Sequence, residues 1–372
     1  MVSSNVTKKS SAWKEYIIMH GNHEVASICK DGTCTIYDEQ FMPYNLYLEV
    51  DAENDIEVRI QNLDNFYYWC ASRVLSLDRE YAKEILNSIG ATQATTDRDR
   101  AQVALSYHCL SLTDIYWTKA KGEEISFEEI NLFENHLEKA FIDVTLRGKQ
   151  MTIHNSHLIA DDLATHGCFP KAWIRKGNTF RLMKDGGLEA VENEILASKI
   201  CRCFRVNQVL YEEDCYDGQK VSSSEIVTSL QMSIVPMESF EIYATNHEIN
   251  RMEYILELDR YSYYMMNTLD YLIGNTDRHW GNWGLFVDNQ TNLPIRLYDL
   301  MDFNEAFQSY DTIEGTRCLT CDKLLTQKEA AIEAVKEIGL NQIEEVPTHW
   351  FADGERREMF YKRLNLLKEN IS

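Results

Sequence analysis

The stretch N-T-D-R-H-W-G-N, from Asn275 to Asn282, decides how this chain is interpreted. It follows residues 252–273, which have strong helical periodicity, and Gly274 between them is a natural helix stop. Asp277 and Asn282 therefore lie five residues apart on a loop that closes a buried helix. A carboxylate can take a proton from a hydroxyl, and carboxylate and amide oxygens are ligands that Mg²⁺ prefers. The stretch thus predicts a site for proton transfer beside a metal ion.

A second metal ligand is expected just beyond this loop. Residues 283–299 form two strand-like stretches around the polar turn N-Q-T-N, which predicts a β-hairpin. Asp302, in M-D-F-N, follows the hairpin, and Asp299 three residues earlier is an alternative. Enzymes that transfer phosphoryl groups in the manner of protein kinases place a metal-binding aspartate after a D-x-x-x-x-N loop. We therefore expect Asn282 and either aspartate to bind Mg²⁺, with Asp277 as the catalytic base.

The upstream segment supplies the remaining parts of such a site. Residues 171–184 predict a β-hairpin with a tight turn at Gly177-Asn178, and a helix with an apolar stripe follows Gly186-Gly187. Protein kinases hold the α- and β-phosphates with a strand lysine that a helical glutamate orients. Lys184 ends the second strand, and the helix offers Glu194, with Glu192 as an alternative. The order of lysine, glutamate, Asp–Asn loop, hairpin and aspartate is that of a kinase.

Other secondary structure can be assigned more coarsely. We expect four short strands within residues 14–50 and helices through much of residues 65–150. Two further strands are expected at residues 206–212 and 225–232, so that the central segment has the order β-β-α-β-β. The last 50 residues are expected to be helical.

At these residues the chain resembles the HipA-like serine/threonine kinases. Four residues fill every position of that family's catalytic loop, N-x-D-x-H-x-x-N: Asn275, Asp277, His279 and Asn282. The family's N-E pair on the helix after the lysine matches Asn193-Glu194, and S-L-T-D-I-Y-W at residues 111–117 resembles a segment of its shorter bacterial members. The resemblance spans roughly residues 65–310.

The resemblance implies an α+β fold of the two-lobed, protein-kinase-like type, with a β-rich N-lobe and a mostly helical C-lobe. Residues 1–150 would be an N-terminal α/β extension of the N-lobe. Residues 151–240 would form its nucleotide-binding core, and residues 241–372 the helical C-lobe with the catalytic loop.

Further site residues follow from the same resemblance. T-H-G-C-F-P-K takes the place of the family's phosphate loop, so Thr165, His166 and Gly167 are expected to contact the nucleotide, and Thr165 is a candidate for autophosphorylation. His279 either takes part in the chemistry or bonds the backbone and holds the loop in shape. D-L-M-D stands where the family has P-x-[YF]-D, and its register favours Asp302 over Asp299.

The function implied is ATP- and Mg²⁺-dependent transfer of a phosphoryl group to a serine or threonine hydroxyl of a protein. The family often pairs with a DNA-binding antitoxin, which makes such a partner possible here. One alternative is a small-molecule kinase of aminoglycoside or choline type, but these have a histidine before the aspartate, and His279 follows Asp277. Another is a non-catalytic pseudokinase module of a toxin–antitoxin or phage-defence system, which the intact Asp, Asn and Lys oppose.

Composition narrows the partners and the compartment. The 372 residues hold 37 Lys and Arg against 59 Asp and Glu, a net charge of −22 that disfavours direct contact with nucleic acid. The 10 Cys residues are scattered without a disulfide framework, which suits a reducing compartment. Neither a signal peptide nor a run of about 18 apolar residues is found, so we expect a cytoplasmic protein without membrane contact.

Overall fold

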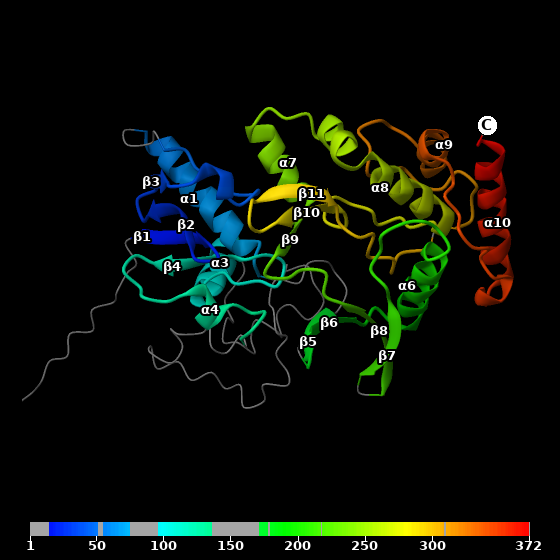
Figure 1. The fold of residues 1–372 in the computed structure, drawn as a ribbon, viewed down its shortest axis with the longest axis horizontal. Helices are drawn as coiled ribbons and strands as arrows, with labels where there is room; N and C mark the ends of the chain where they lie inside the picture. The colour runs from blue at the N-terminus through cyan, green and yellow to red at the C-terminus, as the bar shows by residue number, and fades with distance from the viewer. Residues whose placement is uncertain are drawn as a thin grey trace, which may run out of the picture.

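The computed structural model describes most of the chain. The residues described are 15–50, 55–74, 96–135, 171–177, 179–216, 218–308 and 310–371. Within these ranges, three antiparallel sheets and the helices packed on them make up the fold (Figure 1).

The first sheet is built at the N-terminus. Strands β1 (Glu15–His20), β2 (His23–Cys29), β3 (Cys34–Ile36) and β4 (Tyr116–Ala120) pair in the order β3-β2-β1-β4. Three of the four strands expected before residue 50 are therefore confirmed.

The fourth expected strand, in the segment ending at Val50, is wrong. The backbone N–H and C=O of Glu49 both bond the side-chain amide of Asn62, at 2.9 Å each. Because a helical side chain satisfies this backbone, the segment pairs with no strand. Strand β1 pairs instead with β4, which lies within residues 65–150, where helices were expected.

Two helices cover this sheet. Helix α1 (Ile56–Ala71) begins at Asp55, whose carboxylate accepts from two backbone N–H groups of the first turn. Helix α3 (Asp97–Ser106) begins with a capping box formed by Thr96 and Asp99. Buried residues of both helices join one hydrophobic core with the sheet. Together with the short α4 (Phe127–Ile130) they confirm helices between residues 65 and 150.

The second sheet carries the lysine of the predicted site. Strands β5 (Lys171–Lys176) and β6 (Thr179–Lys184) form the expected hairpin. Helix α6 (Leu188–Cys201) follows, and β7 (Glu212–Tyr216) and β8 (Gln219–Glu225) complete the order β5-β6-β8-β7.

The strands expected at residues 206–212 and 225–232 are displaced. Val209 N–H and Leu300 O bond at 2.9 Å, and Leu300 N–H bonds Asn207 O at 3.0 Å, so the first segment is tied to the loop after a later hairpin. The polar stretch E-E-D-C-Y forms the exposed edge strand β7 in its place, because tertiary contacts override local strand propensity.

The third sheet and the long helices form the rest of the fold. Strands β9 (Met232–Pro236), β10 (Gly284–Asp288) and β11 (Leu293–Leu297) pair in the order β11-β10-β9, and the β10–β11 hairpin is as expected. The helices are α7 (Met237–Asn246), α8 (Arg251–Ile273), α9 (Gln327–Ile338) and α10 (Gly354–Glu369), with short 3₁₀ turns at Glu39–Phe41 and Thr348–Trp350.

Gly274, at the end of α8, turns the backbone into the predicted catalytic loop. Gly274 has φ of +60°, a left-handed conformation that ends the helix. A Cβ at this position would lie 2.4 Å from the ring of Tyr310. Both the conformation and the space therefore require glycine at the point where the helix becomes the loop.

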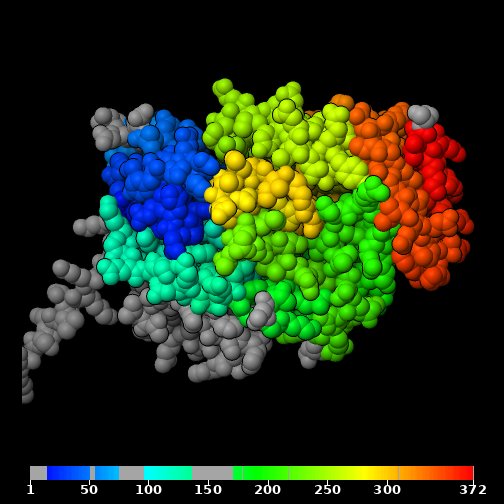
Figure 2. All heavy atoms as spheres, in the orientation of Figure 1, coloured from blue at the N-terminus to red at the C-terminus, as the bar shows by residue number. Residues whose placement is uncertain are grey.

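The N-terminal sheet contacts the β10–β11 hairpin. Blue and yellow surfaces meet there in Figure 2. Asn292 lies in the hairpin turn, and its backbone O accepts from the Tyr44 hydroxyl at 2.8 Å. Its side chain accepts from the Tyr116 hydroxyl through Oδ1 at 3.0 Å and donates to Gln40 O at 2.8 Å. One buried residue thus joins two parts of the fold that are distant in sequence. Within the described residues, no helix is both long enough and apolar enough to span a membrane.

Candidate active site

The loop Asn275–Asn282 is held from below by buried polar contacts. Asn275 is 1% exposed; its amide donates to Asp270 Oδ1 at 3.1 Å, and its backbone O accepts from Gln327 Nε2 at 2.6 Å. Because α8 supplies Asp270 and α9 supplies Gln327, two helices fix the position at which the loop starts.

Arg278 is the main support of the loop, and the sequence interpretation missed it. Its guanidinium forms a two-pronged pair with Asp270, with Nε to Oδ2 at 2.9 Å and Nη2 to Oδ1 at 3.0 Å. Its Nη1 donates to Asn282 O at 2.7 Å and also to Met301 O. The side chain therefore ties the end of the loop Asn275–Asn282 to the residue before Asp302. An aspartate in the apolar stretch T-L-D-Y-L-I was the available signal, since a buried carboxylate needs a partner.

Asp277 and Asn282 face each other across the loop. Asn282 Nδ2 donates to Asp277 O at 2.8 Å and to Asp277 Oδ2 at 3.2 Å. The amide nitrogen is thus engaged, which leaves Asn282 Oδ1 as the end that can meet a cation. Burial raises the pKa of Asp277, His279 opposes that shift, and the charge of Asp302 adds to it, so the net shift is upward.

His279 lies on the rim of the site. Its Nδ1 accepts from the backbone N–H of Gly281 at 3.0 Å, while Nε2 is 3.8 Å from Asp277 Oδ2. About half of the side chain is exposed. The ring therefore shapes the tight turn W-G-N and lies beyond hydrogen-bond distance of the carboxylate.

Lys184 lies at the centre of the site. This residue is 6% exposed, and its Nζ is 2.7 Å from Glu194 Oε1 and 2.9 Å from Asp302 Oδ1. Burial alone would lower the pKa of Lys184, but the Asp302 and Glu194 carboxylates outweigh it and hold the pKa well above its usual value. Glu192, the alternative to Glu194, lies on the outer face of α6 and bonds Lys220 at 3.3 Å.

Asp302 and Asp299 have different surroundings. Asp302 Oδ1 meets Lys184, and burial of its carboxyl is outweighed by Lys184, Lys171 and Arg278, which hold its pKa well below the usual range. Asp299 instead bonds Arg296 at 2.8 Å. Of the two aspartates, Asp302 is the one that the fold brings to the lysine.

Tyr211 is a second residue that the sequence interpretation missed. Its hydroxyl accepts from Lys184 Nζ at 3.3 Å and from Asp302 N–H at 3.2 Å. Lys184 Nζ also lies 4.8 Å from the centre of the Tyr211 ring. The tyrosine thus bridges the lysine and the aspartate, and Asp302 is held with φ of +60°, an uncommon conformation for a residue other than glycine.

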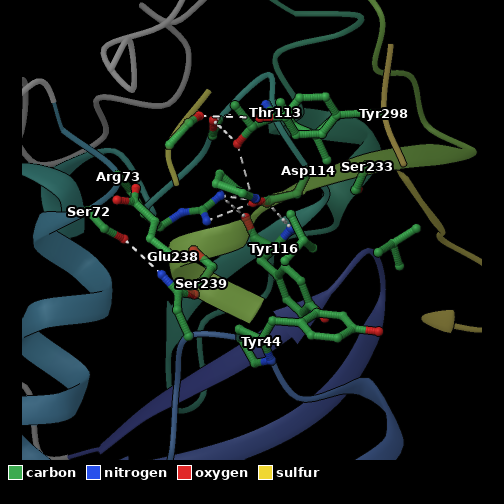
Figure 3. A pocket seen from close by; sticks show the side chains of 18 of the residues that line it. Tyr44, Ser72, Arg73, Thr113, Asp114, Tyr116, Ser233, Glu238, Ser239 and Tyr298 are labelled. Carbon is green, nitrogen blue, oxygen red and sulfur yellow. Dashed lines mark hydrogen bonds and ion pairs between the residues drawn. The ribbon is translucent and has the colours of Figure 1, made fainter. Parts of the chain in front are cut away.

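Part of this site opens onto a cavity of about 210 Å³, which Tyr211 also lines. Lys184, Asn282 and Asp302 line one end, and apolar side chains such as Leu182 and Val235 line its walls. Figure 3 shows another wall of a pocket with this lining, where Arg73 and Asp114 point toward each other and Glu238 and Ser239 approach from α7. Arg73 holds Asp114 through two bonds of 2.6 and 2.9 Å.

The segment S-L-T-D-I-Y-W is what brings that wall to the cavity. Thr113 O accepts from Ile234 N–H at 3.0 Å, so the segment is bonded to β9, and Trp117 Nε1 donates to Gly21 O at 2.6 Å. Asp114 lies between these two anchors. The N-terminal sheet therefore contributes directly to the cavity of the predicted site.

The donor set suits a cation that a ligand helps to bind. In the part of the chain that the structure describes, no group of three or more His, Cys, Asp or Glu side chains is placed to hold a metal ion. Asn282 Oδ1 and the second oxygen of Asp302 are two available oxygen donors. Two donors are too few for Mg²⁺ alone but fit an ion that also binds substrate phosphates and water. Thr165, His166 and Gly167 lie outside the described residues.

Comparison with known proteins finds similarity in structure only. No model of a known protein family matches the sequence, and no curated protein sequence matches it. The proinflammatory kinase CtkA of Helicobacter pylori aligns with a TM-score of 0.40 and 14% identity, over 54% of this chain and 90% of that chain.

The second structure aligns more fully. HipA of Shewanella oneidensis MR-1, solved in complex with HipB and operator DNA, aligns with a TM-score of 0.52 and 13% identity, over 96% of this chain and 88% of that chain. The predicted class is thereby confirmed: the fold is α+β with two lobes. Over nearly its whole length, the chain has the protein-kinase-like fold of HipA.

Proposed function

We propose that this protein is an ATP-dependent serine/threonine protein kinase of HipA type. The observation that carries the proposal is the position of Lys184, whose Nζ bridges Glu194 and Asp302 in a cavity that Asn282 also lines. Four chain segments that are up to 118 residues apart meet there. This is the constellation that phosphoryl transfer requires.

Each residue has a role that its contacts support. Lys184 stays charged and would bind the α- and β-phosphates of ATP, while Glu194 keeps its amine in place. Asn282 and Asp302 would hold Mg²⁺, which supplies positive charge to the phosphoryl oxygens. Asp299, bound to Arg296, is the less suitable ligand.

Asp277 is the proposed catalytic base. The acceptor hydroxyl gives its proton to the Asp277 carboxylate as its oxygen bonds the γ-phosphorus; the bond from that phosphorus to the β,γ-bridging oxygen breaks, and ADP leaves. The raised pKa of Asp277 makes it a better proton acceptor than an exposed aspartate. Asn282 Nδ2 bonds Asp277 Oδ2 and thereby holds the carboxylate beside a residue that lines the cavity.

A partner protein is also proposed. The Shewanella HipA structure contains HipB and operator DNA. This chain has a net charge of −22, which repels nucleic-acid phosphates. Contact with DNA would therefore come through a basic antitoxin partner, and an acidic surface suits the binding of such a partner.

The deciding experiment incubates the protein with γ-labelled ATP, Mg²⁺ and a bacterial lysate, and maps phosphorylated sites by mass spectrometry. We expect label on serine or threonine of specific proteins, with Asp277→Ala inactive but still able to bind nucleotide. Label on an aminoglycoside or choline instead would favour a small-molecule kinase. No thermal shift with ATP and Mg²⁺, and no transfer, would contradict the proposal and favour a pseudokinase module.

A further inference from the structure

The C-terminal helix α10 contacts the helix that carries Glu194. Arg356, in the first turn of α10, donates from Nη1 to Asn193 Oδ1 at 2.9 Å and from Nη2 to Glu189 Oε1 at 2.8 Å. Asn193 is 1% exposed and directly precedes Glu194. Arg356, more than 160 residues later in the chain, therefore bonds α6 directly beside Glu194, the residue that contacts Lys184.

Helix α6 positions two of the contacts of Lys184. Glu194 bonds the amine directly, and its other oxygen accepts from Ser222, the register partner of Lys184 on β8. Ser198, one turn later, accepts from the backbone N–H of Tyr211 at 3.1 Å, and the Tyr211 hydroxyl contacts Lys184. A shift of α6 would therefore disturb two of the three partners of the lysine, Glu194 and Tyr211, at once.

Arg356 also reaches the segment that follows Asp302. Its guanidinium carbon lies 6.0 Å from the centre of the Phe307 ring. Phe307 is 2% exposed, and its N–H donates at 3.0 Å to Ile273 O, the last residue of α8 before the catalytic loop. One guanidinium thus lies between α6 and the chain that leads away from the metal-binding aspartate.

The rest of α10 is fixed in the core. Arg363 is completely buried; it donates to Tyr271 O and, at 2.6 Å, to Thr312 O, and its guanidinium carbon lies 4.3 Å from the centre of the Tyr310 ring. Phe360, Leu364 and Leu367 of the same helix are also buried, so Arg356 extends to α6 from a helix that is packed in the core.

Within its own helix, Arg356 makes one long ion pair, with Nε 3.7 Å from Oδ2 of the N-cap Asp353. A cation in the first turn of a helix opposes the helix dipole, and Asp353 already caps the helix through its bond to Glu355 N–H at 2.8 Å. The two hydrogen bonds of Arg356, to Asn193 and Glu189, both go to α6, so its shortest contacts lie outside its own helix.

We infer that Arg356 is a positioning residue of the active site, which holds α6 where Glu194 meets Lys184. The inference rests on the proposed function for its consequence in phosphoryl transfer. Its structural part, the hold on α6, stands on the contacts alone and can be tested without any activity.

The first test measures the reactivity of the Lys184 amine. Wild type, Arg356→Ala and the exposed-neighbour control Arg357→Ala are treated with a small acylating reagent, and modification of each lysine is followed by mass spectrometry. We expect Lys184 to react about threefold to tenfold faster in Arg356→Ala, as the loss of one or two partly exposed hydrogen bonds predicts. Equal Lys184 rates in all three proteins would overturn the inference, whether or not the protein is a kinase.

The second test asks whether Arg356 acts through Glu194. Arg356→Ala is made alone and in a Glu194→Gln background, and transfer rate, ATP affinity and melting temperature are compared. We expect Arg356→Ala to weaken ATP binding and slow transfer alone, with little change in melting temperature, and to add nothing to Glu194→Gln. Additive effects of the two substitutions would show that Arg356 does not act through Glu194. A wild-type protein that neither transfers phosphate nor binds ATP would contradict the proposed function. The labelling of Lys184 would still show whether Arg356 holds α6 in place.

Discussion

Arg278 and Asp270 form a buried ion pair beneath the catalytic loop, with Nε to Oδ2 at 2.9 Å and both side chains at most 6% exposed. Removing one partner leaves the other charge buried without compensation. Asp270→Asn should therefore lower the free energy of unfolding by about 3–5 kcal/mol, measured by urea denaturation. The more exposed pair Arg296–Asp299 offers a matched control, because Asp299→Asn should cost only about 0–1 kcal/mol. Equal costs for the two variants would contradict this reading of the loop.

Asp277→Asn should lower the rate of phosphoryl transfer by about 10²–10⁴-fold, since it removes the proton acceptor but keeps the size of the side chain. Melting temperature and nucleotide affinity should change little, because about two fifths of the Asp277 side chain is exposed. Asp299→Asn serves again as the control and should retain most of the rate. If both variants lost activity equally, the assignment of Asp277 as the base would be wrong.

His20 predicts acid sensitivity of the N-terminal sheet. Its ring packs between Phe41 and Tyr116, and burial lowers the pKa of His20 from 6.5 to about 4, with Asp114 opposing that shift and His23 adding to it. The unfolded chain therefore binds a proton between pH 6.5 and 4 that the folded chain does not, so stability falls as pH falls through this window. The loss should reach up to about 3 kcal/mol at the acid end.

Substitution separates this effect from the other titrating groups. His20→Phe removes the group and should flatten the pH dependence of the unfolding free energy between pH 6.5 and 4. Identical slopes in wild type and His20→Phe would rule His20 out as the cause.

Gly274→Ala should destabilise the fold more than an equivalent change elsewhere. The left-handed backbone costs an alanine about 1–2 kcal/mol, and the close approach of Tyr310 adds about 1–3 kcal/mol. Gly274→Ala in a Tyr310→Ala background keeps the backbone cost but lacks the ring. The difference between the cost of Gly274→Ala in wild type and in that background, measured by urea denaturation, thus isolates the contact with Tyr310. Equal costs in the two backgrounds would show that the ring moves away without cost.

Much of the site-bearing structure could be predicted because its signals are local. The hairpin around Gly177, the helix that begins at Leu188, and the hairpin after the catalytic loop all have the expected bounds within a few residues. In each, the apolar period and the turn residues favour the same structure, so tertiary contacts had nothing to override.

The parts that could not be predicted depend on partners far along the chain. β4 forms a strand because β1 has a free edge, and the segment before Val50 does not because Asn62 satisfies its backbone. No sequence pattern marks Tyr211 or Arg278 as part of the site. Their roles depend on Lys184 and Asp270, which the fold brings within hydrogen-bond distance of them. The roles of Asp277 and Asp302 remain predictions that activity measurements must decide.

The side-chain amide of Asn282 limits which residue types can stand at position 282 of the loop Asn275–Asn282. Its nitrogen donates to Asp277, while its oxygen has no hydrogen-bond partner among the described residues. Aspartate has nearly the same shape but no donor, so it would face Asp277 with a like charge instead of a bond. The exchange most conservative in size would thus be among the most disruptive, and a sequence pattern that accepts either residue at 282 would admit chains unable to keep this loop in order.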